Sequence, residues 1–199
     1  MNTPSHAVIN LALLMEHPQF ALPIAVGAVL PDLPMFVMYA WAKVVRRQSE
    51  RQIWTETYWQ PQWQLINHSF HSIPLTAIAS AVAYLADYPA IAWLCLSAVL
   101  HSLGDLPVHH DDAHRHWLPF SHYRWISPIS YWDPRHHGAI VALIEKLLVL
   151  VASIYLFPVL TSWIGRSLLV GINLMYVSGY FYQIWHYQCG QIQTQNRQS

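Results

Sequence analysis

The chain has 199 residues, of which 54% are hydrophobic and only 10% are charged. An ordinary soluble domain carries about 25% charged residues, so this chain lacks the charge to cover a fully water-facing surface. Ten basic residues balance ten acidic ones. The sequence therefore offers no basic patch for a phosphate backbone, and we expect no nucleic-acid partner. At this length we expect a single domain, residues 1–199.

The N-terminal part contains two short apolar runs. Thr3 and Pro4 are typical of a helix N-cap followed by proline at the first helical position, and residues 7–15 continue as an apolar run. After a turn, residues 20–30 form a second run. The Pro31-Asp32-Leu33-Pro34 sequence is expected to break this second helix.

Four longer apolar stretches form two pairs, residues 73–86 with 89–104 and residues 139–163 with 167–185. A membrane-spanning helix needs about 20 apolar residues, so each pair is predicted to be a transmembrane hairpin, the first near the lower limit of length. The alternative is a very hydrophobic soluble bundle, because helices without a polar face must be buried all round. Residues 33–66 give no clear prediction. The predicted fold class is all-α, a polytopic integral membrane helical bundle.

The basic residues indicate an orientation. Seven of the ten Lys and Arg residues lie in two segments, 43–66 and 106–138. By the positive-inside rule both segments are predicted to be cytoplasmic, and six Trp residues in the same segments are typical of anchoring at the headgroup level. The bundle is therefore predicted to carry a His/Asp-rich loop on its cytoplasmic side, with membrane lipid as a partner.

Helix ends on this predicted side carry residues able to bind a metal. Successive helices alternate in direction, so the start of one helix and the end of the next face the same way. This rule brings together six residues: His6, Asp32, His68, His71, His101 and Asp105. His101 and Asp105 are four residues apart and share one helical face, which is a geometry that chelates a cation.

The following segment, residues 109–116, adds four His and two Asp residues. If it is helical, its i,i+4 pairs are His110 with His114, Asp112 with His116, and Asp111 with Arg115, the last being a surface ion pair. His110 and His114 are the stronger candidate ligands, and His109, Asp112 and His116 are further candidates. Nitrogen and oxygen donors without thiolate suit zinc, with iron or manganese as alternatives.

Glu145 lies in the apolar stretch 139–163, about 12 Å along a helix from His137. A carboxylate at this depth is expected to face the bundle interior. It would either support the metal site or pair with another polar group.

In order along the chain, four motifs resemble the family of bacterial inner-membrane metal-dependent hydrolases, itself similar to zinc-dependent phospholipase C. They are Thr3-Pro4-Ser5-His6, Gly27-x-x-x-Pro31-Asp32, the segment His68 to His71, and His101-x-x-x-Asp105. The likeness covers residues 3 to about 116. It implies His6, His71, His101 and Asp105 as ligands of a divalent metal, with Asp32 as a ligand or as the base that activates water. It also implies a multi-pass protein of the bacterial inner membrane.

Together these features predict a membrane-bound hydrolase of an ester or phosphodiester in a small-molecule or lipid substrate. A non-enzymatic metal-binding membrane protein with an assembly or transport role is one alternative. A membrane di-iron oxygenase is another, favoured by His110-x-x-x-His114, although the H-x-x-H-H repeats usual in those enzymes are absent from the sequence.

Overall fold

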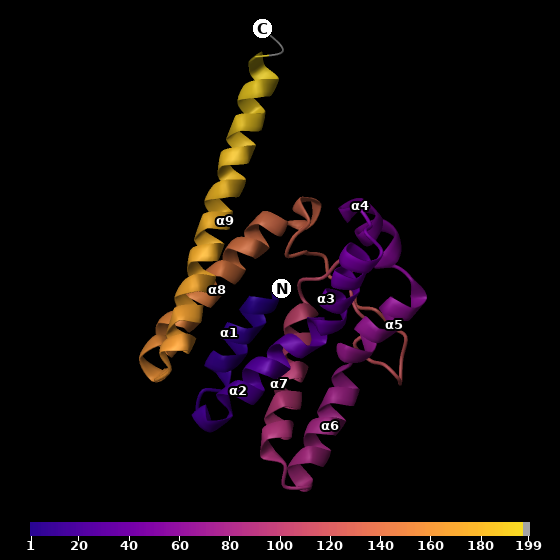
Figure 1. Cartoon of the computed structure of the whole chain (residues 1–199), viewed down its shortest axis with the longest axis vertical. Coiled ribbons are helices and arrows are strands. Elements are labelled where there is room, and N and C mark those ends of the chain that lie inside the picture. Colours follow the sequence, from indigo (N-terminus) through magenta and orange to yellow (C-terminus); the bar gives the residue numbers. More distant parts are fainter. Residues whose placement is uncertain (197–199) are drawn as a thin grey trace.

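The computed structural model describes the backbone of residues 1–196 and the side chains of residues 1–180, and within these limits the fold is all-helical, without β-strands. Figure 1 shows the arrangement. The α-helices are α1 (Thr3–Leu13), α2 (Ala21–Val29), α3 (Leu33–Ala40), α4 (Glu50–Gln52), α5 (Pro61–Phe70), α6 (Ile73–Leu85), α7 (Pro89–Asp105), α8 (Gly138–Val159) and α9 (Trp163–Asn196). Short turns of helix are η1 (Pro18–Phe20), η2 (Leu30–Asp32), η3 (Trp41–Val45), η4 (Ile53–Thr57) and η5 (Pro134–His136).

The first helix starts one residue away from the predicted cap. Asn2 occupies the N-cap position of α1, and Thr3 is the first helical residue. The predicted Thr3 cap is therefore wrong. Its hydroxyl instead donates a hydrogen bond to the Asp32 carboxylate. Thr3 therefore links α1 to η2 and does not cap its own helix.

The prolines at positions 31 and 34 do not break the helical path. Pro31 lies in the first turn of η2 and Pro34 in the first turn of α3, where a missing backbone N–H costs no helical hydrogen bond. The chain stays helical over Pro18–Val45, which includes part of the segment left without a prediction. The α-helix α2 thus ends just before Pro31, as expected, but a 3-10 turn joins it directly to α3 instead of a non-helical break.

Two helical segments among the described residues are long and apolar enough to cross a membrane: Pro18–Val45, with 28 residues, and Gly138–Val159, with 22. Helices α6 and α7 have 13 and 17 residues, so the hairpin predicted there falls short of the usual spanning length. Helix α9 runs through the predicted span 167–185, of which the side chains of 181–185 lie outside the described residues.

Close contact between α2 and α7 depends on Gly27. A Cβ atom placed there would lie 2.0 Å from the backbone oxygen of Leu94, so only glycine permits this approach. Polar side chains tie the same region together, since Asn10 of α1 donates to the backbone oxygen of Ser97, and the Ser97 hydroxyl donates to the backbone oxygen of Ile24. These contacts hold α1, α2 and α7 in fixed register.

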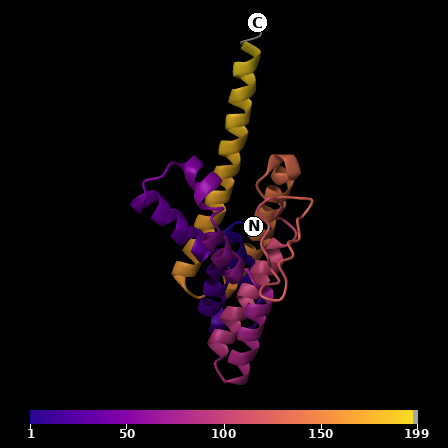
Figure 2. The same ribbon diagram turned by 90° about the vertical axis from the view of Figure 1, so that its right-hand side faces the viewer.

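The turns between α1 and α2, α6 and α7, and α8 and α9 all lie toward the lower end of the molecule in Figure 1. The N-terminus and most of the long irregular segment 106–137 lie above these turns, at about mid-height in Figure 1. In Figure 2 that segment and helices α3–α5 stand on opposite sides of the N-terminus. The candidate site lies between them.

Candidate metal centre

Asp105, the last residue of α7, lies at the centre of a buried group of imidazoles. Its Oδ1 is 2.9 Å from His6 Nε2 and 3.2 Å from His109 Nε2, and its Oδ2 is 3.1 Å from His101 Nε2. The amino group of Met1 lies 2.6 Å from Oδ1. His6 and His101 are fully buried and Asp105 is 2% exposed. The alternation of helix directions therefore brings His6 to the carboxylate of Asp105, 99 positions away in the sequence.

Asp32 approaches the same group from η2. Its Oδ1 is 3.5 Å from His71 Nε2 and 3.6 Å from His101 Nε2. Its other oxygen accepts the hydrogen bond from Thr3. The Asp32 side chain is 13% exposed, more than Asp105, and it lines a pocket. Asp32 is thus the carboxylate through which this cluster meets the pocket.

In His71 and His101, Nδ1 makes a hydrogen bond and Nε2 does not. His71 Nδ1 donates to the backbone oxygen of Asn67 at 2.8 Å, and His101 Nδ1 donates to that of Ala28 at 2.7 Å. Their buried Nε2 atoms make no hydrogen bond of good geometry and face carboxylate oxygens, Asp105 Oδ2 at 3.1 Å from His101 and Asp32 Oδ1 at 3.5 Å from His71. When Nδ1–H donates to a backbone carbonyl, the Nε2 atom of a neutral imidazole carries the lone pair. A hydrogen bond from Nδ1–H to a carbonyl is the usual second contact of a histidine that binds a metal through Nε2. Because a buried polar atom without a hydrogen bond is costly, these two nitrogens fit a bound cation.

The donor atoms form two sets of three: His6, His101 and Asp105 in one, and Asp32, His71 and His101 in the other. Within each set the donor atoms lie within 4.8 Å of one another. Both sets include His101, so they adjoin and together offer five donor residues. Nitrogen and oxygen donors in this number suit a borderline divalent cation.

Three further imidazoles from other elements surround this group. His114 stacks on His71 with ring centroids 3.8 Å apart, and His68 lies edge-on to His114. His116 Nδ1 donates to the backbone oxygen of His71. Burial lowers the pKa of His114 well below its usual value, and burial is also the largest factor that lowers the pKa of His68 and of His116 to about 4. All three are therefore neutral at pH 7, as a ligand or a neighbour of a cation must be.

His109 is held on both sides by carboxylates. Its Nε2 faces Asp105, and its Nδ1 lies 3.1 Å from Asp112 Oδ2. Burial is the largest single effect and acts to lower its pKa, but the Asp105 charge and the hydrogen bonds with Asp105 and Asp112 together raise the pKa of His109. Asp112 also accepts a hydrogen bond from the indole of Trp132. His109 thus connects the cluster to Asp112.

Residues 109–116 form turns rather than a helix, so the predicted i,i+4 pairs are wrong. His110 stacks on His136 at 3.6 Å, and its Nδ1 donates to the backbone oxygen of Ser127, so it is engaged away from the cluster. Asp111 pairs with Arg135 at 3.5 Å instead of Arg115. A loop directs these side chains by tertiary contacts, and helical spacing does not apply to it.

Glu145 faces the bundle interior, as predicted, and is 3% exposed. Its Oε1 accepts hydrogen bonds from the backbone N–H and side-chain amide of Asn2 and, at 2.5 Å, from the hydroxyl of Ser5. The Ser5 hydroxyl is also 2.6 Å from that of Tyr176. Glu145 therefore holds the start of α1 in place, and through it the position of His6.

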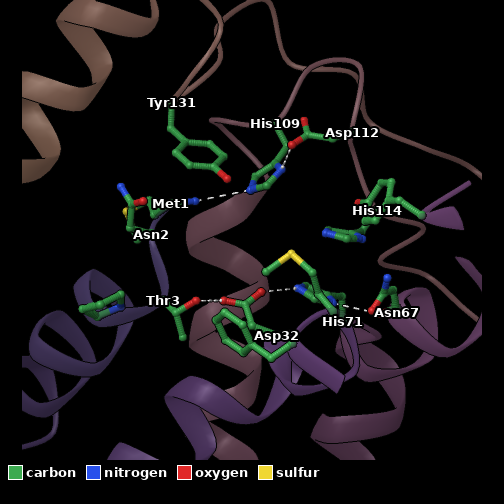
Figure 3. A pocket seen from close by; sticks show the side chains of 14 residues that line it. Met1, Asn2, Thr3, Asp32, Asn67, His71, His109, Asp112, His114 and Tyr131 are labelled. Carbon is green, nitrogen blue, oxygen red and sulfur yellow. Dashed lines mark hydrogen bonds and ion pairs between the residues drawn. The ribbon is translucent and has the colours of Figure 1, made fainter. Parts of the chain in front are cut away.

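A pocket of about 370 Å³ opens beside the cluster, and Figure 3 shows Asp32, His71, His109, His114 and Tyr131 around it. Sequence reasoning missed three other residues here: Asn67, Tyr58 and Tyr131. Asn67 lines the pocket and both polar atoms of its side chain are buried without a partner. Its position one turn before His71 was the available signal, whereas the two tyrosines come from segments whose course the sequence did not predict.

Comparisons with protein-family models, with curated proteins and with solved structures found no match for this chain. Over the residues that the structure describes, the fold and the site together define an all-helical protein with two helical segments able to span a membrane and a buried His/Asp cluster that could hold a metal ion.

Proposed function

We propose that this protein is a multi-pass membrane hydrolase that uses a divalent metal, preferably zinc, to cleave an ester or phosphodiester at the cytoplasmic membrane surface. The observation that carries the proposal is the pair of buried Nε2 atoms of His71 and His101, which make no hydrogen bond and face two carboxylates beside an open pocket. The four motifs of the hydrolase resemblance also supply the donors of this one cluster, His6, Asp32, His71, His101 and Asp105.

The residues of the cluster would have different roles in metal binding and in catalysis. His6, His71, His101 and Asp105 are buried and would hold the ion. A bound divalent metal would lower the pKa of a water molecule to about 7 and stabilise charge on substrate oxygens. Asp32 lines the pocket and is oriented by Thr3, so it is placed to accept a proton at its carboxylate. Tyr131 closes the opposite wall of the pocket, as Figure 3 shows.

A membrane setting is favoured by the surface of the helices. Large apolar side chains on α8 and α6 point outward, among them Leu147, Val151 and Ile154 on α8 and Val82 and Leu85 on α6, all at least half exposed. Contiguous exposed apolar surface of this kind is rare on soluble monomers. We propose that a bilayer covers it and that α6 and α7 enter the bilayer with the two longer segments.

The direct test is metal analysis and hydrolysis on the purified protein in detergent, with bis(p-nitrophenyl) phosphate and p-nitrophenyl acetate as substrates. We expect about one ion per chain and hydrolysis that a chelator abolishes and added zinc restores. His101→Ala should lose both, whereas His17→Ala, whose ring packs on Trp93 away from the cluster, should keep both. Bound metal without hydrolysis would favour the non-enzymatic alternative, and absence of metal would contradict the proposal.

Orientation has its own test. Phe120 is 74% exposed in the segment predicted to be cytoplasmic. A Phe120→Cys variant in a chain lacking its native cysteines should resist a membrane-impermeant maleimide added to intact cells and react after permeabilisation. Efficient labelling of intact cells would show that the orientation is reversed.

A further inference from the structure

A second pocket, of about 530 Å³, adjoins the pocket of the metal centre. Met35, Tyr58, Asp112 and Tyr131 line both. We call it the aromatic pocket, because its remaining walls include Trp54, Trp59 and Trp132. Its volume falls within the range of about 300–1,000 Å³ that is usual for small-molecule sites. Since four residues are shared, one ligand could occupy both spaces.

The walls of the aromatic pocket offer ring faces more than polar groups. The Trp59 indole N–H donates to the backbone oxygen of Trp54, and the Trp132 indole N–H donates to Asp112. Tyr58 packs edge-on against Trp59, with ring centroids 5.1 Å apart. These two indole N–H groups already donate to acceptors within the protein. The ring faces of Trp59 and Trp132 therefore remain available for contact with an apolar ligand.

The two carboxylates at the pocket do not turn it into a cation site. Asp112 is paired with His109 at 3.1 Å and with the Trp132 indole. Asp111 lies 3.5 Å from the guanidinium of Arg135. Each negative charge therefore has a partner within the protein, which favours a hydrocarbon over a quaternary ammonium group as the occupant of this aromatic enclosure.

We infer that the aromatic pocket binds the hydrocarbon chain of an amphiphilic substrate whose ester or phosphoester head lies at the metal centre. This inference rests on the proposed function and names its substrate class. Met35, which belongs to a segment able to span a membrane, lines both spaces and lies where head and chain would join. Trp54, Trp59 and Trp132 are the specificity-determining residues, and the affinity should rise by up to about fourfold for each methylene buried.

The test uses tryptophan quenching by bromine in protein reconstituted into lipid nanodiscs without added metal. The probe is 11-bromoundecyl phosphate, and the competitors are undecyl phosphate, butyl phosphate, inorganic phosphate and tetramethylammonium. We expect a saturable quenching component that undecyl phosphate displaces far better than butyl phosphate, and that the other two competitors leave in place. Displacement by tetramethylammonium, or quenching that is only linear in probe concentration, would overturn the inference.

Two matched variants locate the quenched residues. A triple variant with Trp54→Phe, Trp59→Phe and Trp132→Phe should lose the saturable component. A control triple variant with Trp41→Phe, Trp117→Phe and Trp125→Phe, whose indoles are similarly exposed but do not line the aromatic pocket, should retain it. Equal saturable quenching in the two variants would place the chain elsewhere and overturn the inference.

Failure of the inference can be told apart from failure of the proposed function. Bis(p-nitrophenyl) phosphate carries no alkyl chain, so its hydrolysis reports on the metal centre alone. Hydrolysis of this substrate without saturable quenching would leave the proposed function standing and overturn the chain-binding pocket. Saturable quenching without any hydrolysis would support the aromatic pocket as a binding site for the hydrocarbon chain and would contradict the proposed catalytic function. The bound amphiphile would then be a ligand and not a substrate.

Discussion

Asp32 and Glu145 are two carboxylates in comparable places with different surroundings. Each belongs to one of the two segments able to span a membrane, and each is held by the start of α1: Thr3 donates to Asp32, and Asn2 and Ser5 donate to Glu145. Asp32 faces two imidazoles and an open pocket. Glu145 faces the neutral donors of Asn2 and Ser5 and is buried.

This difference shows that the residue type and depth of an ionisable group do not define its role. A carboxylate inside a membrane protein is costly and therefore usually functional, yet the two here serve different ends. Asp32 adds negative charge beside free nitrogen lone pairs, which suits a cation. Glu145 collects hydrogen bonds on one oxygen, which fixes the position of α1. Five substitutions and two controls test this distinction, in order of expected effect.

The largest effect should come from Asp105→Asn, which removes the charge at the centre of the cluster while keeping the side-chain shape. A dication in a low-dielectric site needs its charge compensated, so metal affinity should fall by more than about 100-fold and hydrolysis should be lost with it. Metal content of the folded variant measures this.

Its control is Asp111→Asn. Asp111 is more than half exposed and pairs with Arg135 at the surface, an interaction worth at most about 1 kcal/mol, so metal content should not change. Unchanged metal in Asp105→Asn as well would mean that the Asp105 contacts are structural hydrogen bonds.

Asp32→Asn should come next. The variant keeps the hydrogen bond from Thr3 but cannot accept a proton, so hydrolysis should fall by about 100- to 10,000-fold. Metal content should fall less than in Asp105→Asn, because Asp32 is the more exposed of the two carboxylates. Steady-state rates and metal analysis on one preparation decide it, and an unchanged rate would remove Asp32 from the catalytic proposal.

Glu145→Ala should act on stability. It removes the acceptor of the buried Ser5 hydroxyl and of the exposed Asn2, which should cost about 1–3 kcal/mol for the one buried donor left unsatisfied. Thermal unfolding in detergent measures this, with Lys146→Ala as the neighbouring control, since Lys146 makes a long hydrogen bond of 3.4 Å to Ala142 and lies 5.9 Å from the centre of the Tyr180 ring, away from Asn2 and Ser5. Metal content of Glu145→Ala at low temperature should stay close to that of the parent chain. A complete loss there would place Glu145 among the metal-site residues.

The smallest effects should separate Thr3 from Ser5. Thr3→Val removes the donor to Asp32 and should lower hydrolysis by about fivefold, which corresponds to the roughly 1 kcal/mol of one hydrogen bond. Ser5→Ala should lower the unfolding temperature and leave the rate unchanged. If both variants changed only the unfolding temperature, the contrast between the two carboxylates would be one of packing alone.

By itself the sequence determined the all-helical class and which helix ends carry His and Asp. Helix direction alternates along the chain, so His6, His71, His101 and Asp105 had to meet at one end once the helices formed, and the i,i+4 spacing of His101 and Asp105 follows from helical geometry. These are local properties, and sequence spacing encodes them.

Only the tertiary structure decided how the rest of the site is assembled. The loop 109–116 is not helical, so its spacing could not say that His114 stacks on His71 while His110 turns away to His136. Likewise, Pro31 and Pro34 are compatible with both a break and a continuing helix, and Glu145 could pair with any donor nearby. Contacts between segments far apart in sequence settle these points, because a loop side chain takes the direction in which its packing and hydrogen bonds are satisfied.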